Sequence, residues 1–348
     1  MSHVESHFAR LHGIHDIRVE TGVAAQPGDG EVRLRMARGG ICGSDLHYYD
    51  HGGVGTIRVR EPIILGHEAS GYVEAAGRGA DLAVGTLVAI NPSQPCGRCD
   101  RCAAGLPRHC RNMRFRGSAM YMPHEQGLYR SRLTVPASQC VAFPEGADPG
   151  AAACTEPLAV CLHALSRVPG NLGGKRVLVT GAGPIGLLTA AAAKAKGAGF
   201  VAITDVQDKP LAIATKMGVD QTFCVGTDAN WRASLGEMDV AFECSAAASA
   251  IEDAVEALKP CGTLVEVGVA GNTSLPLGRL VAKEITMIGT HRFDQEFQEA
   301  VRMIADQTID VAPMITGVWP LSQVREALDA ALDRAQNSKV QINLQEVN

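Results

Sequence analysis

The pattern of hydrophobic and polar positions changes near residue 153 and divides the chain into two parts. Before that point, short runs rich in β-branched residues, such as 31–36 and 86–90, are separated by glycine and proline. Such runs bounded by turn residues are typical of short β-strands. We therefore expect the first part to be β-rich and barrel-like.

From about residue 153 onward, apolar helical stretches alternate with short apolar runs. These runs fall at residues 177–180, 201–204, 240–242 and 264–267. Strands of a parallel sheet that are buried on both faces read as continuous apolar runs, and repeated β–α units build a doubly wound sheet. The sequence thus predicts an α/β protein with a β-rich domain and a parallel-sheet domain.

The pattern changes again after about residue 291. A helix is expected over residues 297–306, then a turn at Trp319–Pro320, a second helix, and an alternating strand over 339–344. We expect this tail to pack back onto the first part. The predicted division is a catalytic domain of residues 1–152 and 292–348, and a dinucleotide-binding domain of residues 153–291.

Charge and composition narrow the classes of partner. The 348 residues hold 37 acidic residues against 32 lysines and arginines, a net charge of -5. This balance gives no basic face for nucleic acid and no polybasic anchor for a membrane. The polar N-terminus lacks the apolar core of a signal peptide, and no stretch reaches about 18 apolar residues. We expect a cytoplasmic protein whose partner is a small molecule.

Four of the 11 cysteines form a dense cluster, Cys96, Cys99, Cys102 and Cys110. Four thiolates at this spacing close the coordination shell of a structural zinc ion. Arg98, Arg101 and Arg108 are expected to offset the thiolate charge. A nucleic-acid-binding zinc module is the other interpretation of this loop, and the acidic net charge disfavours it. The six cysteines that lie outside both this cluster and position 42 are expected to be packing residues.

A second metal site is suggested by two separate stretches. Cys42 is followed by Ser44 and His47, and His67 is followed by Glu68. Each residue alone is more often part of a core. Together, one thiolate, one imidazole and one carboxylate would leave a coordination position open for a substrate.

A glycine-rich turn follows the apolar run 177–180 and precedes an alanine-rich helix. Its sequence is Gly181-Ala182-Gly183-Pro184-Ile185-Gly186. A strand before and a helix after this turn are the context of a dinucleotide site, whose pyrophosphate lies at the helix N-terminus. Asp205, at the end of the next strand, would accept hydrogen bonds from a ribose diol and repel a 2'-phosphate. We therefore expect NAD rather than NADP, with Val267, Gly268 and Val269 also at the cofactor.

Taken together, these stretches resemble the zinc-dependent medium-chain dehydrogenases, in particular the polyol dehydrogenase branch. The resemblance covers nearly the whole chain and is carried by residues 38–49, 65–68, 89–93, 117–121, 156–160 and 337–341. It implies a GroES-like catalytic domain beside a Rossmann domain, two zinc ions per chain and a homotetramer.

The resemblance also implies roles for single residues. Cys42, His67 and Glu156 would hold the catalytic zinc, with Glu68 beside the metal and able to ligate it. Zinc would lower the pKa of the substrate hydroxyl, and the hydride would pass to NAD. Ser44 would take the hydroxyl proton and pass it through the cofactor ribose to His47.

One departure from the polyol pattern bears on the substrate. Arg292-Phe293 stands where sorbitol dehydrogenase has Arg-Tyr. Arg292 could bind substrate hydroxyls or a carboxylate, or be an ordinary surface arginine; Arg114 and Arg116 are further candidates for a carboxylate. The expected reaction interconverts L-idonate and 5-keto-D-gluconate. A sorbitol or xylitol dehydrogenase is the alternative, and a noncatalytic zinc- and nucleotide-binding relative is the alternative from a different class.

Overall fold

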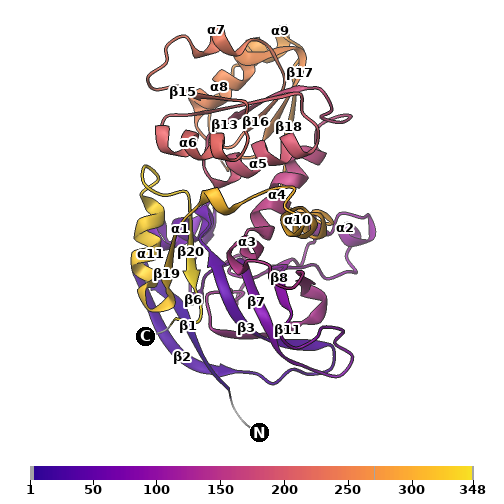
Figure 1. Cartoon of the computed structure of the whole chain (residues 1–348), viewed down its shortest axis with the longest axis vertical. Helices are drawn as coiled ribbons and strands as arrows, with labels where there is room; N and C mark the ends of the chain where they lie inside the picture. Colours follow the sequence, from indigo (N-terminus) through magenta and orange to yellow (C-terminus); the bar gives the residue numbers. More distant parts are fainter. Residues whose placement is uncertain (1–3, 270, 347–348) are drawn as a thin grey trace.

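The computed structural model describes residues 4–269 and 271–346. It has two lobes stacked along the long axis of the molecule, as Figure 1 shows. Both ends of the described chain contribute to one lobe, and the middle of the chain builds the other. The predicted fold class, a β-rich lobe joined to a doubly wound parallel sheet, is confirmed.

The first lobe is built around a seven-stranded sheet whose central strands are β3 and β7. A three-stranded sheet, β2-β1-β6, lies beside it. The strands of this lobe are β1 (Val4–Gly13), β2 (Asp16–Ala24), β3 (Glu31–Gly40), β4 (Gly53–Val54), β5 (Ile57–Arg58), β6 (Ile63–Ile64), β7 (Glu68–Ala76), β8 (Leu87–Ile90), β9 (Ser93–Gln94), β10 (Arg114–Phe115), β11 (Arg132–Pro136), β12 (Cys140–Ala142), β19 (Ile315–Pro320) and β20 (Lys339–Asn343). Its helices are α1 (Gly43–His51), α2 (Asp100–Ala103), α3 (Pro149–Ala153) and α11 (Val324–Leu332).

The C-terminal strand β20 pairs antiparallel with β3 and parallel with β19. Our expectation of a turn at Trp319–Pro320 is wrong, because both residues end β19 and pair with β20. Proline is tolerated there since β19 is at the edge of the sheet, where its missing N–H costs no ladder bond. The expected in–out alternation of β20 is also wrong: its first four residues are all buried, because the strand is covered on both faces.

The second lobe is a six-stranded parallel sheet in the order β15-β14-β13-β16-β17-β18. Its strands are β13 (Arg176–Thr180), β14 (Phe200–Asp205), β15 (Gln221–Cys224), β16 (Met238–Glu243), β17 (Leu258–Glu266) and β18 (Thr286–Gly289). Its helices are α5 (Pro184–Ala195), α6 (Asp208–Lys216), α7 (Trp231–Leu235), α8 (Ala248–Ala257) and α9 (Leu277–Ala282). The strand order reverses between β13 and β16, and ligands of such sheets bind at the carboxyl ends of the strands near this switch.

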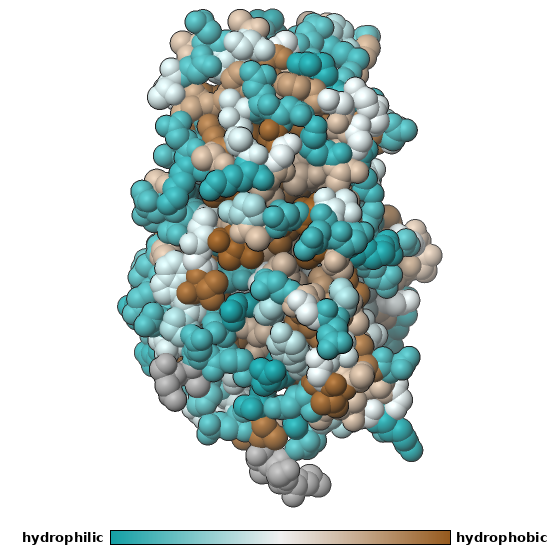
Figure 2. Space-filling model, in the orientation of Figure 1, coloured by the Kyte–Doolittle hydropathy of each residue, from teal (hydrophilic) through white to brown (hydrophobic). Residues whose placement is uncertain are grey.

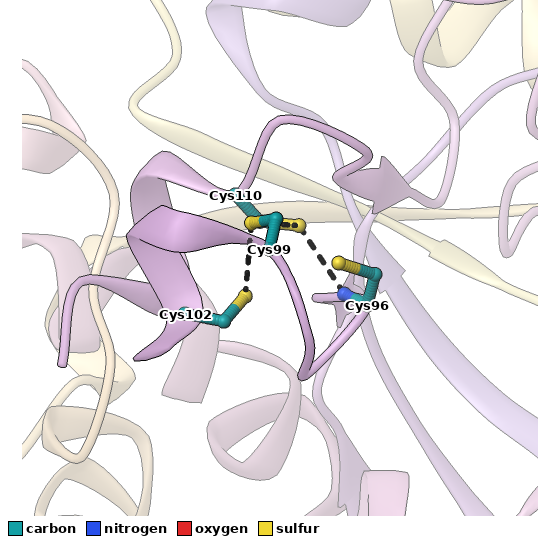
Figure 3. Close-up of side chains that lie close together, drawn as sticks. All are labelled: Cys96, Cys99, Cys102 and Cys110. Carbon is teal, nitrogen blue, oxygen red and sulfur yellow. Dashed lines mark hydrogen bonds between the residues drawn. The ribbon is translucent and has the colours of Figure 1, made fainter. Parts of the chain in front are cut away.

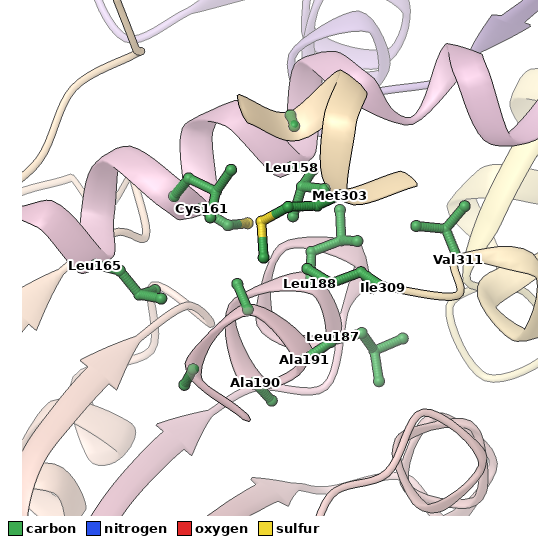
Figure 4. Close-up of a cluster of buried hydrophobic side chains, with 14 of the residues drawn as sticks. Leu158, Cys161, Leu165, Leu187, Leu188, Ala190, Ala191, Met303, Ile309 and Val311 are labelled. Atoms are coloured by element: carbon green, nitrogen blue, oxygen red, sulfur yellow. The ribbon is translucent and has the colours of Figure 1, made fainter. Parts of the chain in front are cut away.

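Helices α4 (Thr155–Ser166) and α10 (Glu296–Ala305) join the two lobes. Leu158 of α4, Leu188 of α5 and Met303 of α10 lie close together in Figure 4 and belong to the largest apolar core. Because both helices pack in this core, the first turn of α4 and the segment that precedes α10 are held in place at the boundary between the lobes.

The outer surface is mostly hydrophilic, with scattered apolar residues, on the face that Figure 2 shows. Among residues 4–269 and 271–346, no helix has the length and apolar character that a membrane crossing requires.

Candidate active site

The four clustered cysteines converge on one point, as Figure 3 shows. All four sulfur atoms lie within 4.8 Å of one another, with Cys99 Sγ 3.6 Å from Cys102 Sγ and 3.9 Å from Cys110 Sγ. A tetrahedron of Zn–S bonds of about 2.3 Å has edges of about 3.8 Å. The two measured sulfur–sulfur distances are thus close to those of a zinc site.

Backbone N–H groups favour negative charge on two of these sulfur atoms, those of Cys96 and Cys110. The backbone N–H of Cys96 lies 3.2 Å from Cys110 Sγ, and that of Asn112 lies 3.3 Å from the same atom. A backbone hydrogen bond from Arg98, with others in the loop, lowers the pKa of Cys96 to about 6. The prediction that Arg108 offsets the thiolate charge is wrong, because its guanidinium pairs with Asp294 instead.

The second cluster brings together Cys42, His67 and Glu68, whose candidate ligand atoms all lie within 4.8 Å of one another. Cys42 is the N-cap of α1 and follows β3, while Glu68 begins β7. Because β3 and β7 are paired with Gly40 opposite Glu68, the ends of the two strands bring these separate stretches to one place.

A buried carboxylate that the sequence analysis gave no role, that of Asp45, organises this cluster. Its oxygens accept hydrogen bonds from the backbone N–H groups of Cys42, at 3.0 Å, and Gly66, at 3.1 Å. The hydroxyl of Tyr129 lies 3.0 Å away. The signal was present in the sequence, since an acidic residue three positions after a helix N-cap is a capping pattern.

Glu68 is committed to a buried ion pair with Lys339 of β20. Lys339 Nζ lies 2.7 Å and 3.0 Å from the two carboxylate oxygens, and both side chains are almost fully buried. Burial opposes the charge of Lys339, but Glu68 and Cys42 raise its pKa above the usual range. The ion pair thus neutralises one of the carboxylates beside the cluster.

Glu156, in the first turn of α4, lies outside the group of three ligands but within its electrostatic reach. Burial raises the pKa of Glu156 to about 7, while His67 and Lys339 oppose the rise. Burial also disfavours charge on His67, yet Asp45 and Cys42 raise the pKa of its ring well above the usual value. The rise at His67 reflects the acidic groups around its ring, and such surroundings suit a divalent cation.

Ser44 and His47 lie one turn apart on α1 and therefore share a face of the helix. Ser44 is half-buried, whereas His47 is exposed. The partial burial of its ring and the neighbouring His51 lower the pKa of His47. The helix thus leads from Cys42 to a neutral imidazole in contact with solvent.

The glycine turn has the geometry of a nucleotide loop. Gly181 has a φ of +88°, and a Cβ on Gly186 would lie 1.8 Å from the carbonyl oxygen of Gly181, so both positions require glycine. Open space surrounds the Cα of Gly183, and Pro184 and Ile185 begin α5.

Asp205 lies next to this turn at the carboxyl end of β14. Its carboxylate accepts hydrogen bonds from the backbone N–H groups of Ala182, at 2.6 Å, and Gln207, at 2.9 Å. Val267, Gly268 and Val269 follow β17 at the same edge of the sheet, with Val269 strongly exposed. The predicted cofactor residues therefore line one edge.

The three candidate arginines are in different states. Arg114 pairs with Glu125 at 2.7 Å, and Arg116 donates to Gln139 at 3.0 Å. The guanidinium of Arg292 has no hydrogen bond or ion pair within the described residues; it stacks over the ring of Phe115 at 4.6 Å. Phe115 in turn lies 5.6 Å from the ring of His67, so Arg292 is next to the second cluster. Phe115 is a further site residue that the sequence analysis missed.

The remaining cysteines are mostly buried or half-buried, and none of the 11 forms a disulfide. Cys261 is the exception to the expectation of packing residues, because it is exposed.

Comparison with known proteins identifies relatives for both lobes. A family model described as "Alcohol dehydrogenase GroES-like domain" matches residues 28–145, and one described as "Zinc-binding dehydrogenase" matches residues 184–306. L-idonate 5-dehydrogenase (NAD(P)(+)) of Escherichia coli (strain K12) is 40% identical over 312 residues, 89% of this chain and 90% of that protein. Sorbitol dehydrogenase of Homo sapiens is 34% identical over 328 residues, 92% of this chain and 90% of that protein.

A solved structure is similar along almost its whole length. The crystal structure of L-idonate 5-dehydrogenase from Escherichia coli K-12 substr. MG1655 matches with a TM-score of 0.93 and 38% identity, covering 98% of this chain and 99% of that one.

Proposed function

The chain belongs to the zinc-binding dehydrogenases of the alcohol dehydrogenase type, and on that basis we propose that it oxidises L-idonate to 5-keto-D-gluconate in an NAD-linked reaction. The secondary alcohol loses a proton and a hydride and becomes a ketone, and the reverse reaction restores it. The relatives named L-idonate 5-dehydrogenase suggest this substrate, and Arg292 offers a guanidinium that would bind its carboxylate.

The single observation that carries the proposal is the 40% identity to L-idonate 5-dehydrogenase over 89% of this chain. Arg292 is the residue that we propose binds the acid. The guanidinium of Arg292 is half-buried next to the metal cluster. Glu156 is within its electrostatic reach, but no carboxylate of the described residues is paired with it. A half-buried, unpaired guanidinium gains most from a bidentate carboxylate. A sugar acid supplies that group, whereas a neutral polyol supplies hydroxyls alone.

The proposed metal ligands differ from the cluster of Cys42, His67 and Glu68 in one residue, with Glu156 in place of Glu68. We assign Cys42, His67 and Glu156 as the ligands of the catalytic zinc, with Glu68 held aside by Lys339. A zinc ion bound there would act as a Lewis acid that lowers the pKa of the substrate hydroxyl. Cys96, Cys99, Cys102 and Cys110 would hold the second, structural ion.

The residues of α1 would move the proton. Ser44 accepts it from the substrate hydroxyl, and His47 passes it to solvent, because its imidazole is neutral and exposed at neutral pH. Asp45 takes no proton in this scheme; it fixes Cys42 and the turn before His67.

We further propose NAD as the preferred cofactor. The carboxylate of Asp205 lies at the glycine turn, where it would bind a ribose diol and repel a 2'-phosphate. Lys209 is the cationic residue nearest to Asp205 in the sequence and could favour a 2'-phosphate. Its ammonium group donates to the side chain of Gln336. The free thiols support a cytoplasmic location, and a homotetramer is the assembly that we expect.

A sorbitol or xylitol dehydrogenase is the second candidate, favoured by the 34% identity to the human sorbitol dehydrogenase. In that case Arg292 would bind hydroxyls. A noncatalytic relative, the candidate from a different class, conflicts with the intact set of Cys42, Ser44, His67 and Glu156.

Initial rates of NAD reduction with L-idonate, D-gluconate, sorbitol and xylitol test the proposal, each measured before and after zinc chelation and restoration. We expect a zinc-dependent rate that is highest with L-idonate. A preference for sorbitol or xylitol would move the substrate to the polyol class, and no turnover with any of the four would support the noncatalytic relative.

A further inference from the structure

A short segment, residues 291–294, leads from β18 toward α10 and carries Arg292. It is contacted at three places by the four-cysteine loop (residues 96–110) and by β10, which follows that loop. Figure 1 shows the two regions side by side where the lobes meet, with α2 beside α10.

The strongest of the three contacts joins Arg108 to Asp294. The backbone N–H of Arg108 donates to Asp294 Oδ1 at 3.0 Å, and its guanidinium pairs with Oδ2. The two side chains are only 14% and 17% exposed. A charge-assisted, two-point contact with this little exposure constrains geometry more than a surface ion pair does.

The other two contacts fall on the neighbouring residues. The ring of His109 stacks on that of His291, with centroids 5.6 Å apart and planes 21° apart. The ring of Phe115 lies under the guanidinium of Arg292. Residues 291, 292 and 294 are thus each held by a residue from one continuous stretch of the first lobe.

The backbone of Arg292 needs such support. Its φ of 52° lies in the left-handed region, which costs a residue with a Cβ about 1 kcal/mol or more. Conformations of this kind persist only when their surroundings fix the chain on both sides. Phe293 is buried against Phe297 at 5.5 Å, and Asp294 is held by Arg108.

We propose that Arg108 is a positioning residue that, through Asp294, holds Arg292 in the orientation in which it receives the substrate. The inference rests on the proposed function, because it takes Arg292 as the group that binds the substrate. It gives the four-cysteine loop a second role, since η1 (Pro107–His109) leads directly into the metal-ligand position Cys110. The loop then sets substrate affinity as well as stability.

A double-mutant cycle tests this coupling. We expect Arg108→Ala to raise KM for L-idonate about tenfold while kcat changes less than about twofold, because the residue acts through the binding group alone. Arg108→Lys should recover part of the loss. In an Arg292→Ala background, adding Arg108→Ala should change KM less than about twofold.

Arg111→Ala is the matched control. Arg111 lies in the same region and makes an equally close two-point pair, with Asp100 at 2.6 and 2.7 Å, but this pair is exposed and does not touch residues 291–294. We expect its KM to equal that of the wild type. Zinc content and NAD affinity should be unchanged in all variants.

The inference is overturned if the effects of Arg108→Ala and Arg292→Ala add, or if Arg111→Ala raises KM equally. It is also overturned if Arg108→Ala lowers kcat, zinc content and NAD affinity together, as a general loss of structure would. If Arg108→Ala is insoluble, Asp294→Asn removes the same ion pair. KM is then measured for Asp294→Asn alone and in the Arg292→Ala background. If the wild type oxidises only a neutral polyol, the proposed function is wrong. The double-mutant cycle, measured with that polyol, still tests whether Arg108 acts through Arg292.

Discussion

Glu243 and Glu266 lie directly opposite each other at the carboxyl ends of β16 and β17. Glu243 accepts hydrogen bonds from Ser245 and Ala246, whereas the carboxyl group of Glu266, half-buried, has only Glu243 as a neighbouring polar partner among the described residues. Burial, followed by the charge of Glu243, raises the pKa of Glu266 to about 8. We therefore expect Glu266 to bind a proton in the folded chain at neutral pH.

This pair predicts how stability depends on pH. Between about pH 4.5 and pH 8 the folded chain binds more protons at Glu266 than the unfolded chain does, so the free energy of unfolding should fall as pH rises through this window. Glu266→Gln keeps the shape and removes the charge. It should stabilise the protein at pH 8 by about 1 kcal/mol, a value reduced for partial exposure, and have little effect at pH 4.5.

Urea unfolding midpoints at the two pH values measure this effect. Glu252→Gln, which changes an exposed glutamate on α8, is the control and should leave the pH dependence unchanged. The same pH dependence in Glu266→Gln as in the wild type would contradict the prediction.

Arg292 gives a prediction about substrate class. Arg292→Ala should raise KM for L-idonate about 10- to 100-fold, the effect of losing a charge-assisted bidentate contact. KM for sorbitol should change little. Arg114→Ala is the control, because Arg114 already pairs with Glu125. Equal losses for the acid and the polyol would mean that Arg292 binds hydroxyls instead of a carboxylate.

At the residue scale, the sequence could predict what local spacing determines. The glycine turn and the four cysteines are short runs whose geometry follows from their own residues. Glu68, Glu156 and Lys339 come from β7, α4 and β20, so their relation depends on how three distant elements pack. Spacing along the chain does not predict how these three elements pack. The choice of Glu156 over Glu68 as zinc ligand stays a prediction.

At the scale of elements, the four-cysteine loop between β9 and β10 has few buried apolar residues and depends on its ligands. Cys99→Ser should reduce bound zinc from two ions to one per chain and lower the melting temperature by roughly 5–10 °C, because metal-binding free energy contributes to folding.

Metal analysis and thermal unfolding measure both effects. Cys261→Ser, which changes an exposed thiol outside either cluster, should keep two ions and the melting temperature. If Cys99→Ser kept both ions, the four thiols would not be the structural site.

Most strands of the second lobe could be predicted because each is a continuous apolar run that a parallel sheet buries on both faces. The tail was harder. The Trp319–Pro320 pair is typical of a turn, yet both residues continue β19. Pairing with β20 outweighs the preference of proline for turns, and an edge strand tolerates proline. Local propensity cannot foresee a partner strand that lies further along the chain.

At the scale of the whole molecule, the edge of the second-lobe sheet is apolar and uncovered. Strand β18 ends the sheet, and the exposed side chains of Leu277 and Val281 on the nearby α9 are 64% and 77% accessible. An exposed edge strand beside an apolar helix favours pairing with another chain. We therefore expect this edge to be one of the contacts of the predicted homotetramer, since a tetramer needs a second contact as well.

Val281→Glu should therefore lower the molar mass in solution, measured by light scattering after size-exclusion chromatography, because it buries a charge in the contact. Val84→Glu, at an exposed valine of the first lobe, should leave the mass unchanged. A monomeric wild type, or equal masses for both variants, would contradict assembly through this edge.

The return of β20 to β3 has a consequence for the order in which the protein can mature during its synthesis. The ion pair between Glu68 and Lys339 cannot form until Lys339 has been translated. Lys339 follows Glu68 by 271 residues and comes after the entire nucleotide-binding lobe. Until then the central sheet of the first lobe has an open edge and an unneutralised carboxylate inside it. A nascent chain that has already made Cys42, His67 and Glu68 thus holds the parts of a metal centre without its finished pocket, and the ribosome completes the second lobe before the first can close.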